Sequence, residues 1–183
     1  MKLANLRKVL DTYGKLVERS AKANLTKAKK RNTDSLYNSI KYLVRKYKGD
    51  LNLTFSMLGY GTFVDKGVKG TKSSTKAPQS PYRFGSGKGG SGLRAGINKW
   101  VTQKKDLKGV VRDKKGRFIP RKSLQFLIVR SIWNTGLETT NFFSNPFNNL
   151  QKRNKSEIID AFLKDFTADL EKEVNSKTFT DGK

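Results

Sequence analysis

Hydrophobic positions near the start of the chain recur every three or four residues. This series comprises Leu3, Leu6, Leu10, Tyr13, Val17, Ala21 and Leu25. Such spacing places apolar side chains on one face of a helix and leaves the other faces polar. The pattern predicts an amphipathic first helix, which ends in the basic stretch 27–31.

A spacing of two replaces helical spacing between residues 40 and 57. Ile40, Tyr42 and Val44 share one face of an extended segment, and Leu51, Leu53, Phe55 and Met57 then alternate cleanly with polar residues. Alternation of this kind is typical of strands with one buried face. Gly49 and Asp50 suit the two central positions of a tight turn. The sequence therefore predicts an antiparallel hairpin in which Val44 opposes Phe55 and Tyr42 opposes Met57.

The middle of the chain alternates between short helices and loops. Residues 60–67 predict a short helix or turn, and the Gly, Ser, Lys and Pro content of Lys69–Gly92 predicts a long loop. A short amphipathic helix is expected next, with apolar positions at Leu93, Ile97, Trp100 and Val101. The stretch 107–119 is expected to form a second, basic loop around a turn at residues 113–116.

A third helix is predicted after Pro120. Ser123 is placed to cap its N-terminus and Gly136 to end it. The residues expected to share its apolar face are Leu124, Leu127, Ile128, Ser131 and Ile132.

The last helix has the clearest start signal of the chain. Asn154 and Glu157 have the spacing of a capping box. The apolar positions that follow are Ile159, Phe162, Phe166, Leu170 and Val174. Together these patterns predict an α+β fold: an N-terminal amphipathic helix, an antiparallel hairpin or small sheet, several short helices, extended basic loops and a long C-terminal helix.

Length and charge narrow the class of protein. The chain has 183 residues, the length of a single domain, and its 39 Lys and Arg against 15 Asp and Glu give a net charge of +24. The positive charge is confined to residues 1–137, which carry +25, whereas residues 138–183 carry −1. Self-repulsion of this size weakens a lone compact monomer, so we expect an anionic or assembled partner.

Several kinds of catalytic site are disfavoured by composition. With no Cys and no His, the chain has no thiolate nucleophile, no imidazole base and none of the usual nitrogen or sulfur ligands of zinc. The carboxylates of the basic portion are scattered, which argues against a magnesium-dependent nuclease. We therefore expect no enzymatic activity, no metal and no cofactor.

One glycine motif has the spacing of a nucleotide-binding loop but lacks the context that such a site needs. Gly85, Gly87 and Gly90 have the spacing G-x-G-x-x-G, but the preceding residues 78–81 contain two prolines where a buried strand is required. Gly89 also stands where a phosphate-binding loop needs Ser or Thr after its lysine. A flexible linker is the favoured interpretation.

Basic clusters are the strongest functional signal. Long cationic side chains on loops can follow a phosphate backbone without reading sequence. The candidate contacts for DNA or another polyanion are Lys104, Lys105, Lys108, Arg112, Lys114, Lys115, Arg117, Arg121 and Lys122.

Targeting signals are not evident. The first ten residues carry three basic side chains and lack the apolar stretch of a signal peptide, and apolar runs elsewhere are far shorter than the ~20 residues that cross a bilayer. We expect a soluble protein that is made in a cytoplasm and does not bind membranes.

Three blocks carry a resemblance to a known family. These are residues 32–40, with the sequence NTDSLYNSI, residues 59–67, with GYGTFVDKG, and residues 142–147, with FFSNPF. In this order, around a helix and a hairpin, they are similar to the neck and tail-completion proteins of tailed bacteriophages, small α+β subunits that form rings where head meets tail.

The resemblance implies a structural subunit of the virion with no active site. Tyr60, Phe63, Asp65 and Gly67 would hold the second helix against the sheet, while Pro146 and Phe147 would close the core. Relative to the compact family core, residues 68–137 resemble a basic insertion with long loops. The expected partners are copies of the same chain in a ring of about six or about twelve, neighbouring neck, portal or tail proteins, and DNA in the channel. The alternative is a non-catalytic nucleic-acid-binding protein that contacts the phosphate backbone.

Overall fold

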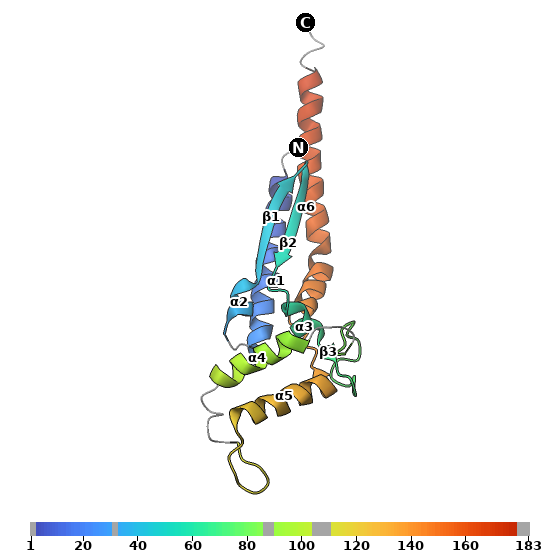
Figure 1. Cartoon of the computed structure of the whole chain (residues 1–183). Coiled ribbons are helices and arrows are strands. Elements are labelled where there is room, and N and C mark those ends of the chain that lie inside the picture. The colour runs from blue at the N-terminus through green and yellow to red at the C-terminus, as the bar shows by residue number, and fades with distance from the viewer. Residues whose placement is uncertain (1–2, 31–32, 86–89, 104–110, 179–183) are drawn as a thin grey trace. The chain divides into compact units, whose positions relative to one another are not determined.

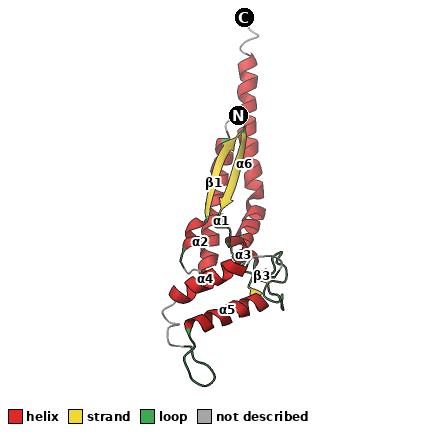
Figure 2. Ribbon diagram, viewed as in Figure 1, coloured by secondary structure: helices red, strands yellow, loops and turns green. Residues whose placement is uncertain are grey.

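The computed structural model describes residues 3–30, 33–85, 90–103 and 111–178. The chain divides into two compact units, one formed by residues 1–58 and 142–183 and the other by residues 59–141. The fold is α+β, as predicted, with long helices near both ends of the chain (Figures 1 and 2). The stretch 68–137, expected to be an insertion, lies entirely within the second unit.

The first unit packs three helices and a hairpin around one core. Helix α1 spans Ala4–Lys27, the short helix α2 spans Ser35–Ser39 and helix α6 spans Ser144–Thr178. Strands β1 (Lys41–Tyr47) and β2 (Asp50–Ser56) form an antiparallel pair that lies along α1 (Figure 2). The buried face of α1 is the predicted one, because Tyr13, Val17, Ala21 and Leu25 are all buried.

An aromatic cluster fills the space where the hairpin, α1 and the start of α6 meet. The ring of Phe55 lies 5.4 Å from that of Phe143 and 5.8 Å from that of Phe147, both edge to face. The Tyr13 ring contacts Phe55 and Phe147, and its hydroxyl donates to the Phe147 carbonyl at 3.1 Å. Edge-to-face pairs of this kind add stabilisation beyond apolar burial, so the cluster ties residues from both ends of the chain together.

The hairpin differs from its predicted register. Val44 pairs with Leu53 and Tyr42 pairs with Phe55, so every predicted pair is displaced by two residues. The turn centres on Lys48 and Gly49, whose φ angles of 50° and 95° are both positive. Two positive φ angles match the right-handed twist of the strands, which moves the turn one residue earlier than expected. A shift of two residues leaves the same side chains on the buried face.

The predicted start of the last helix is wrong. Helix α6 begins at Ser144, ten residues before Asn154, so Asn154 and Glu157 lie inside the helix and do not cap it. Its buried face begins earlier because Pro146 is buried in the first turn and Phe147 belongs to the aromatic cluster. Tertiary packing therefore stabilises helix on the N-terminal side of the capping-box spacing at Asn154 and Glu157. Pro146 is tolerated because it lies in the first turn of the helix.

The second unit contains the remaining elements. These are helix α3 (Gly61–Lys66), strand β3 (Val68–Lys69), helix α4 (Gly90–Gln103), helix α5 (Arg121–Thr135) and strand β4 (Gly136–Leu137). Strands β3 and β4 pair antiparallel, and α4 packs against α5. The predicted loop after Lys69 is anchored to the end of α5, since the backbone N–H groups of Thr71 and Lys72 donate to Trp133 and Asn134.

Helix α5 corrects two expectations. It begins at Arg121 after Pro120, so Ser123 lies within the first turn and makes no cap, although Gly136 ends the helix as predicted. Leu127 and Ser131 were expected on the buried face but are exposed. Leu124, Ile128 and Ile132 are half-buried and form the inner face.

The N-terminus of α1 is capped by a residue from the other end of the chain. Helix α1 has no side-chain cap and no acidic residue in its first turn. Instead, the Asp165 carboxylate of α6 accepts the backbone N–H groups of Asn5 and Leu6 at 3.1 and 2.8 Å, and Asn5 Nδ2 at 2.9 Å. Burial alone would raise the pKa of Asp165, but these hydrogen bonds outweigh it and hold the pKa below its usual value.

We predict that Asp165→Ala lowers the free energy of unfolding by about 1–2 kcal/mol, because it removes the cap and the charge that faces the helix dipole. A lowered pKa in the folded state means that the contribution is present above the ordinary carboxyl pKa and is lost as pH falls through the folded value. Denaturant unfolding at pH 7 and at acidic pH measures this. Asp160→Ala, an exposed acid on the same helix, is the control. If Asp165→Ala lowered the free energy of unfolding by the same amount at pH 7 and at acidic pH, the result would contradict an ionised cap.

Candidate functional site

The predicted basic loop forms a compact hairpin over residues 111–119, here called the basic hairpin. Arg112 and Phe118 pair as an antiparallel bridge, and the Ile119 N–H donates to the Val111 carbonyl at 2.9 Å. Gly116, with a φ of 78°, closes the turn. The basic residues of the loop therefore have a defined backbone framework.

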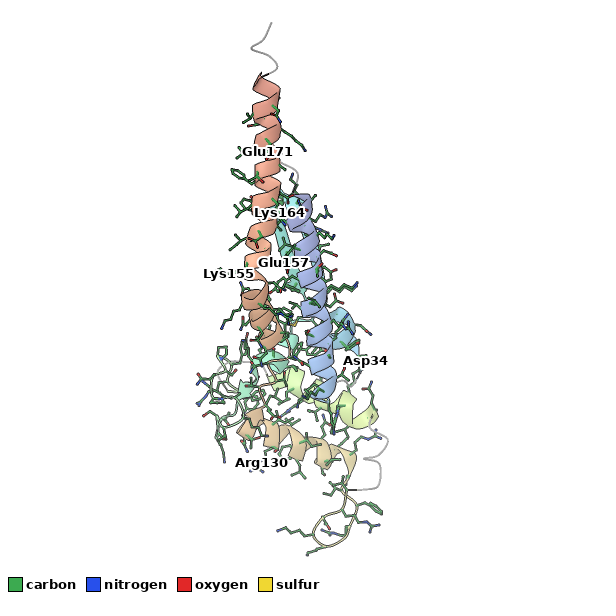
Figure 3. All side chains as sticks on the ribbon, turned by 180° about the vertical axis from the view of Figure 1, so that it is seen from behind. Asp34, Arg130, Lys155, Glu157, Lys164 and Glu171 are labelled. Carbon is green, nitrogen blue, oxygen red and sulfur yellow. The ribbon has the colours of Figure 1, made fainter. Side chains whose placement is uncertain are left out.

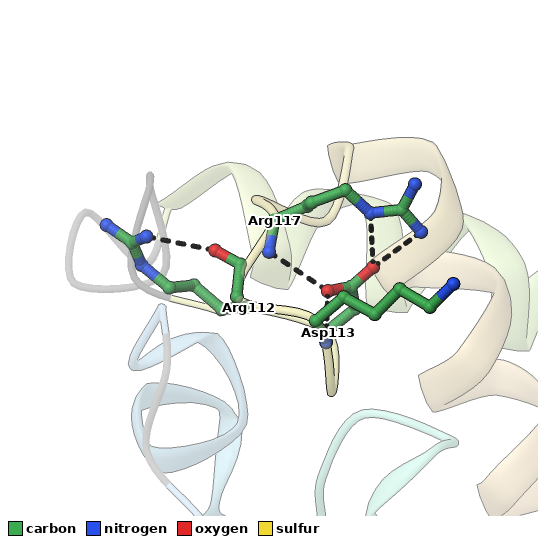
Figure 4. A network of polar contacts seen from close by, with 5 residues as sticks. Arg112, Asp113 and Arg117 are labelled. Atoms are coloured by element: carbon green, nitrogen blue, oxygen red, sulfur yellow. Dashed lines mark hydrogen bonds and ion pairs between the residues drawn. The ribbon is translucent and has the colours of Figure 1, made fainter.

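Asp113 organises the turn of the basic hairpin (Figure 4). Its Oδ1 accepts the backbone N–H groups of Lys115 and Arg117, both at 2.9 Å, while its Oδ2 accepts Arg117 Nε at 2.9 Å and lies 2.9 Å from Arg117 Nη2. The backbone hydrogen bond from Arg117 is the largest cause of a lowered pKa for Asp113, and it outweighs the opposing effect of desolvation. The carboxylate is thus kept ionised as the internal acceptor of the loop.

The hairpin divides its cations into two groups. Arg117 is paired with Asp113, and the Arg112 guanidinium donates to the Gly116 carbonyl at 2.9 Å and lies 4.1 Å from the centre of the Phe118 ring. These two arginines stabilise the loop. Lys114 and Lys115 lie at its turn and are exposed, so they remain available for an external anion.

The start of α5 adds two more exposed cations beside the hairpin in sequence. Arg121 and Lys122 occupy the first turn of α5, which has no acidic residue and no side-chain cap. Cations are unfavourable at the positive end of a helix dipole, whereas an anion bound there is stabilised. Of the nine predicted polyanion contacts, six are thus described, while Lys104, Lys105 and Lys108 lie outside the described residues.

The block 59–67 that carries the resemblance is bound to one short segment of the second unit. The Asp65 carbonyl accepts the N–H groups of Thr140 and Asn141, and the Thr140 hydroxyl donates to the Val64 carbonyl at 2.7 Å. Asp65 itself is buried. The two chain segments that enter and leave this unit are therefore held together by backbone hydrogen bonds.

Gly67 is required by the backbone at this position. Its φ is 70°, and a Cβ would lie 2.7 Å from the Leu137 carbonyl oxygen and 2.8 Å from the Ala77 Cβ. Its own carbonyl accepts the buried Ser80 hydroxyl at 2.7 Å. A side chain here would combine strained φ with a clash, so only glycine suits the position.

The resemblance implies that the two aromatic residues of the same block hold the second helix against the sheet, and both are exposed in the structure. Tyr60 is exposed, and the exposed Phe63 ring contacts the Tyr82 ring edge to face at 4.7 Å. Pro146 is buried, and Phe147 belongs to the aromatic cluster of the first unit.

A second surface was missed by sequence analysis. Six large apolar residues of α6, here called the α6 stripe, are between 42% and 60% exposed: Ile159, Phe162, Leu163, Phe166, Leu170 and Val174. Five of them are the apolar positions from which the sequence predicts the last helix, and Leu163 is the sixth. The face that packs on α1 instead contains the buried Ala161 and Asp165, which helical spacing places opposite the stripe. A buried Asp gave no hydrophobic signal by which this face could be found.

No match was found to a protein-family model, to a curated protein or to a solved structure. Within the described ranges, no three acidic side chains gather in a way that could hold a metal ion. No described helix is both long and apolar enough to cross a membrane.

We predict that the Asp113 carboxyl titrates below pH 3.8, its ordinary pKa, because of its hydrogen bonds to Arg117 and Lys115. Arg117→Gln should raise this pKa only partly, since the backbone N–H groups still donate. Arg112→Gln is the matched control, because the Arg112 guanidinium donates to Gly116 rather than to Asp113. NMR titration of the Asp113 carboxyl carbon measures the pKa, and a wild-type midpoint at or above 3.8 would refute the arrangement.

Proposed function

We propose that the chain is a non-catalytic structural subunit of a tailed-phage virion, which assembles with copies of itself into a ring at the neck or tail end. Neighbouring neck, portal or tail proteins would be its other partners. In this proposal the chain acts in the virion after assembly in the host cytoplasm.

The observation that carries the proposal is the α6 stripe. Exposed contiguous apolar surface on a soluble chain marks a site of interaction with another molecule. The rings of Phe162 and Phe166 stack at 6.2 Å on this outer face, away from α1. The net charge of +24 destabilises an isolated monomer, and six large apolar side chains are exposed on one helix. Both features favour an assembly over a monomer.

The modest core of the second unit supports the same proposal. Among its described residues, the buried hydrophobic side chains are Val68, Ala77 and Val101, all small or medium in size. Burial of so little apolar surface contributes limited stability, and subunit contacts stabilise such units by mass action. The blocks 59–67 and 142–147 border the two points where the chain passes between units, so the resemblance coincides with residues that define the architecture.

Mass spectrometry of purified phage particles tests the proposal. We expect a fixed number of copies per particle, because a closed ring has a defined number of subunits, and the resemblance implies about six or about twelve. The major capsid protein serves as the internal reference for copy number. Absence of the chain from particles that retain their tails would refute the assignment to the virion.

A second candidate function, binding of nucleic acid through its phosphate backbone, is favoured by the basic hairpin. Lys114, Lys115, Arg121 and Lys122 are exposed on adjacent segments, whereas Arg112 and Arg117 are held within the loop. Contact with phosphates would not read base sequence. Such a surface is compatible with a ring that surrounds DNA and equally with a free DNA-binding protein.

The salt dependence of duplex binding tests this second function. We predict that K114E/K115E lowers the slope of log affinity against log salt by about 1–2, because each lost phosphate contact removes about 0.9. The matched control is K152E/R153E, which makes the same charge change at exposed positions of α6. Equal slopes for both double variants would show that the hairpin is not the binding surface.

A further inference from the structure

The α6 stripe is bordered by negative charge. Between residues 156 and 176, α6 holds six carboxylates and two lysines in a chain whose total charge is +24. One of the six, Asp165, is buried against α1, so the remaining side chains carry a net charge of −3. Charged side chains, among them Glu157, Lys164 and Glu171, project along the helix (Figure 3). Asp160, Glu171 and Glu173 are exposed on this part of α6. The stripe therefore combines an apolar centre with an acidic border.

The outer face of α5 has the opposite character. Phe126 and Leu127 are 56% and 50% exposed, whereas the half-buried inner face of α5 packs against α4. Lys122 and Arg130 lie one turn before and one turn after Phe126, and α5 contains no acidic residue. Lys122, Phe126, Leu127 and Arg130 form what we call the α5 face. It is an apolar centre with a basic border.

We propose that the α6 stripe of one copy docks on the α5 face of a second copy. The inference rests on the proposed function, in which copies of the chain form a ring, and it names the two surfaces that meet. Both surfaces offer apolar side chains to the contact, and their borders carry charges of opposite sign. Electrostatic complementarity of this kind selects the partner and its orientation.

Charge also disfavours the simplest rival, in which two α6 stripes pair with each other. Such a contact would bring together two segments that each carry −3 outside the buried Asp165, and like charges across an interface are unfavourable. The same reasoning disfavours contact between two α5 faces. The acidic segment of α6 is instead complementary to the basic border of the α5 face of another copy.

A contact between two different surfaces has a consequence for assembly. Each copy uses its stripe once and its α5 face once, so the interface is heterologous and continues from copy to copy. Such an interface produces a closed ring when the rotation between neighbours closes and a filament when it does not. A pair of α6 stripes would instead produce an isologous dimer that stops at two copies.

Cysteine cross-linking distinguishes these arrangements, because the chain has no cysteine of its own. The two variants are Leu170→Cys on the stripe and Leu127→Cys on the α5 face, both at exposed positions. They are treated with a short bismaleimide, first separately and then as a mixture. A cross-link that forms only in the mixture must join two copies. Arg45→Cys, exposed on strand β1, replaces Leu170→Cys in the control mixture.

The expected result is a covalent dimer in the Leu170→Cys and Leu127→Cys mixture, with little in either variant alone or in the control mixture. Equal cross-linking of Leu170→Cys alone would show that α6 pairs with α6, which overturns the proposal. The oligomeric state of the wild-type chain, measured by light scattering, separates failure of this contact from failure of the proposed ring function. Multimers without the mixed cross-link overturn this contact and leave the ring function standing. A strict monomer without cross-link overturns the contact as well, and the particle copy number then decides the ring function independently.

Charge reversal provides a second, reversible readout. D160K/E173K on α6 and K122E/R130E on α5 should each weaken self-association by about tenfold, and a chain with all four changes should recover most of it. Recovery cannot be explained by misfolding of either double variant. Loss of association in both double variants with no recovery in the combined chain would count against the pairing of these two surfaces.

Discussion

The packing of α6 on α1 is the contact on which the first unit depends. These helices come from opposite ends of the sequence, and residues 59–141 lie between the two parts of the unit. The Asp165 carboxylate accepts hydrogen bonds from N–H groups at the N-terminus of α1, while the Tyr13 ring in the middle of α1 contacts the Phe147 ring near the start of α6. One end of the pair is thus aligned by charge-assisted hydrogen bonds and the other by aromatic packing. Closing this contact brings together the two ends of a long intervening chain, and the packing of α6 on α1 offsets the entropic cost of that closure.

That same packing decides which side of α6 is free. With Ala161 and Asp165 turned toward α1, the six residues of the α6 stripe are left exposed on the far side. The helix also continues past the start of α1, since Asp165 lies at that end and α6 runs on to Thr178 (Figure 1). The internal contact of the unit therefore creates the surface from which we infer assembly. The acidic border of this surface stands out because the rest of the chain is strongly basic.

In the second unit, backbone geometry is more important than apolar burial. The segments 64–69 and 136–141 are joined by hydrogen bonds and by the pairing of β3 with β4, and Gly67 permits a close approach between them. The basic hairpin follows the same principle, because Asp113 satisfies two backbone N–H groups and one guanidinium. Both features keep a highly charged unit ordered with few large buried side chains. The cations that are not needed for this order, Lys114 and Lys115, are left for an external anion.

Local patterns in the sequence determined the α+β class, helix α1 with its buried face, the existence of strands β1 and β2, and the end of α5 at Gly136. Each of these depends on periodicity or on a single residue's backbone preference, which act within a few positions. The hairpin register depends on the local turn at Lys48 and Gly49. Tertiary structure decided the outward direction of the apolar stripe of α6 and continued that helix through the cap signal back to Ser144. The cap signal at Asn154 and Glu157 was overridden because Pro146 and Phe147 are packed earlier in the helix. The buried face of α6 could not be read from the sequence, because a carboxylate is stable there only when the N-terminus of α1 lies against it.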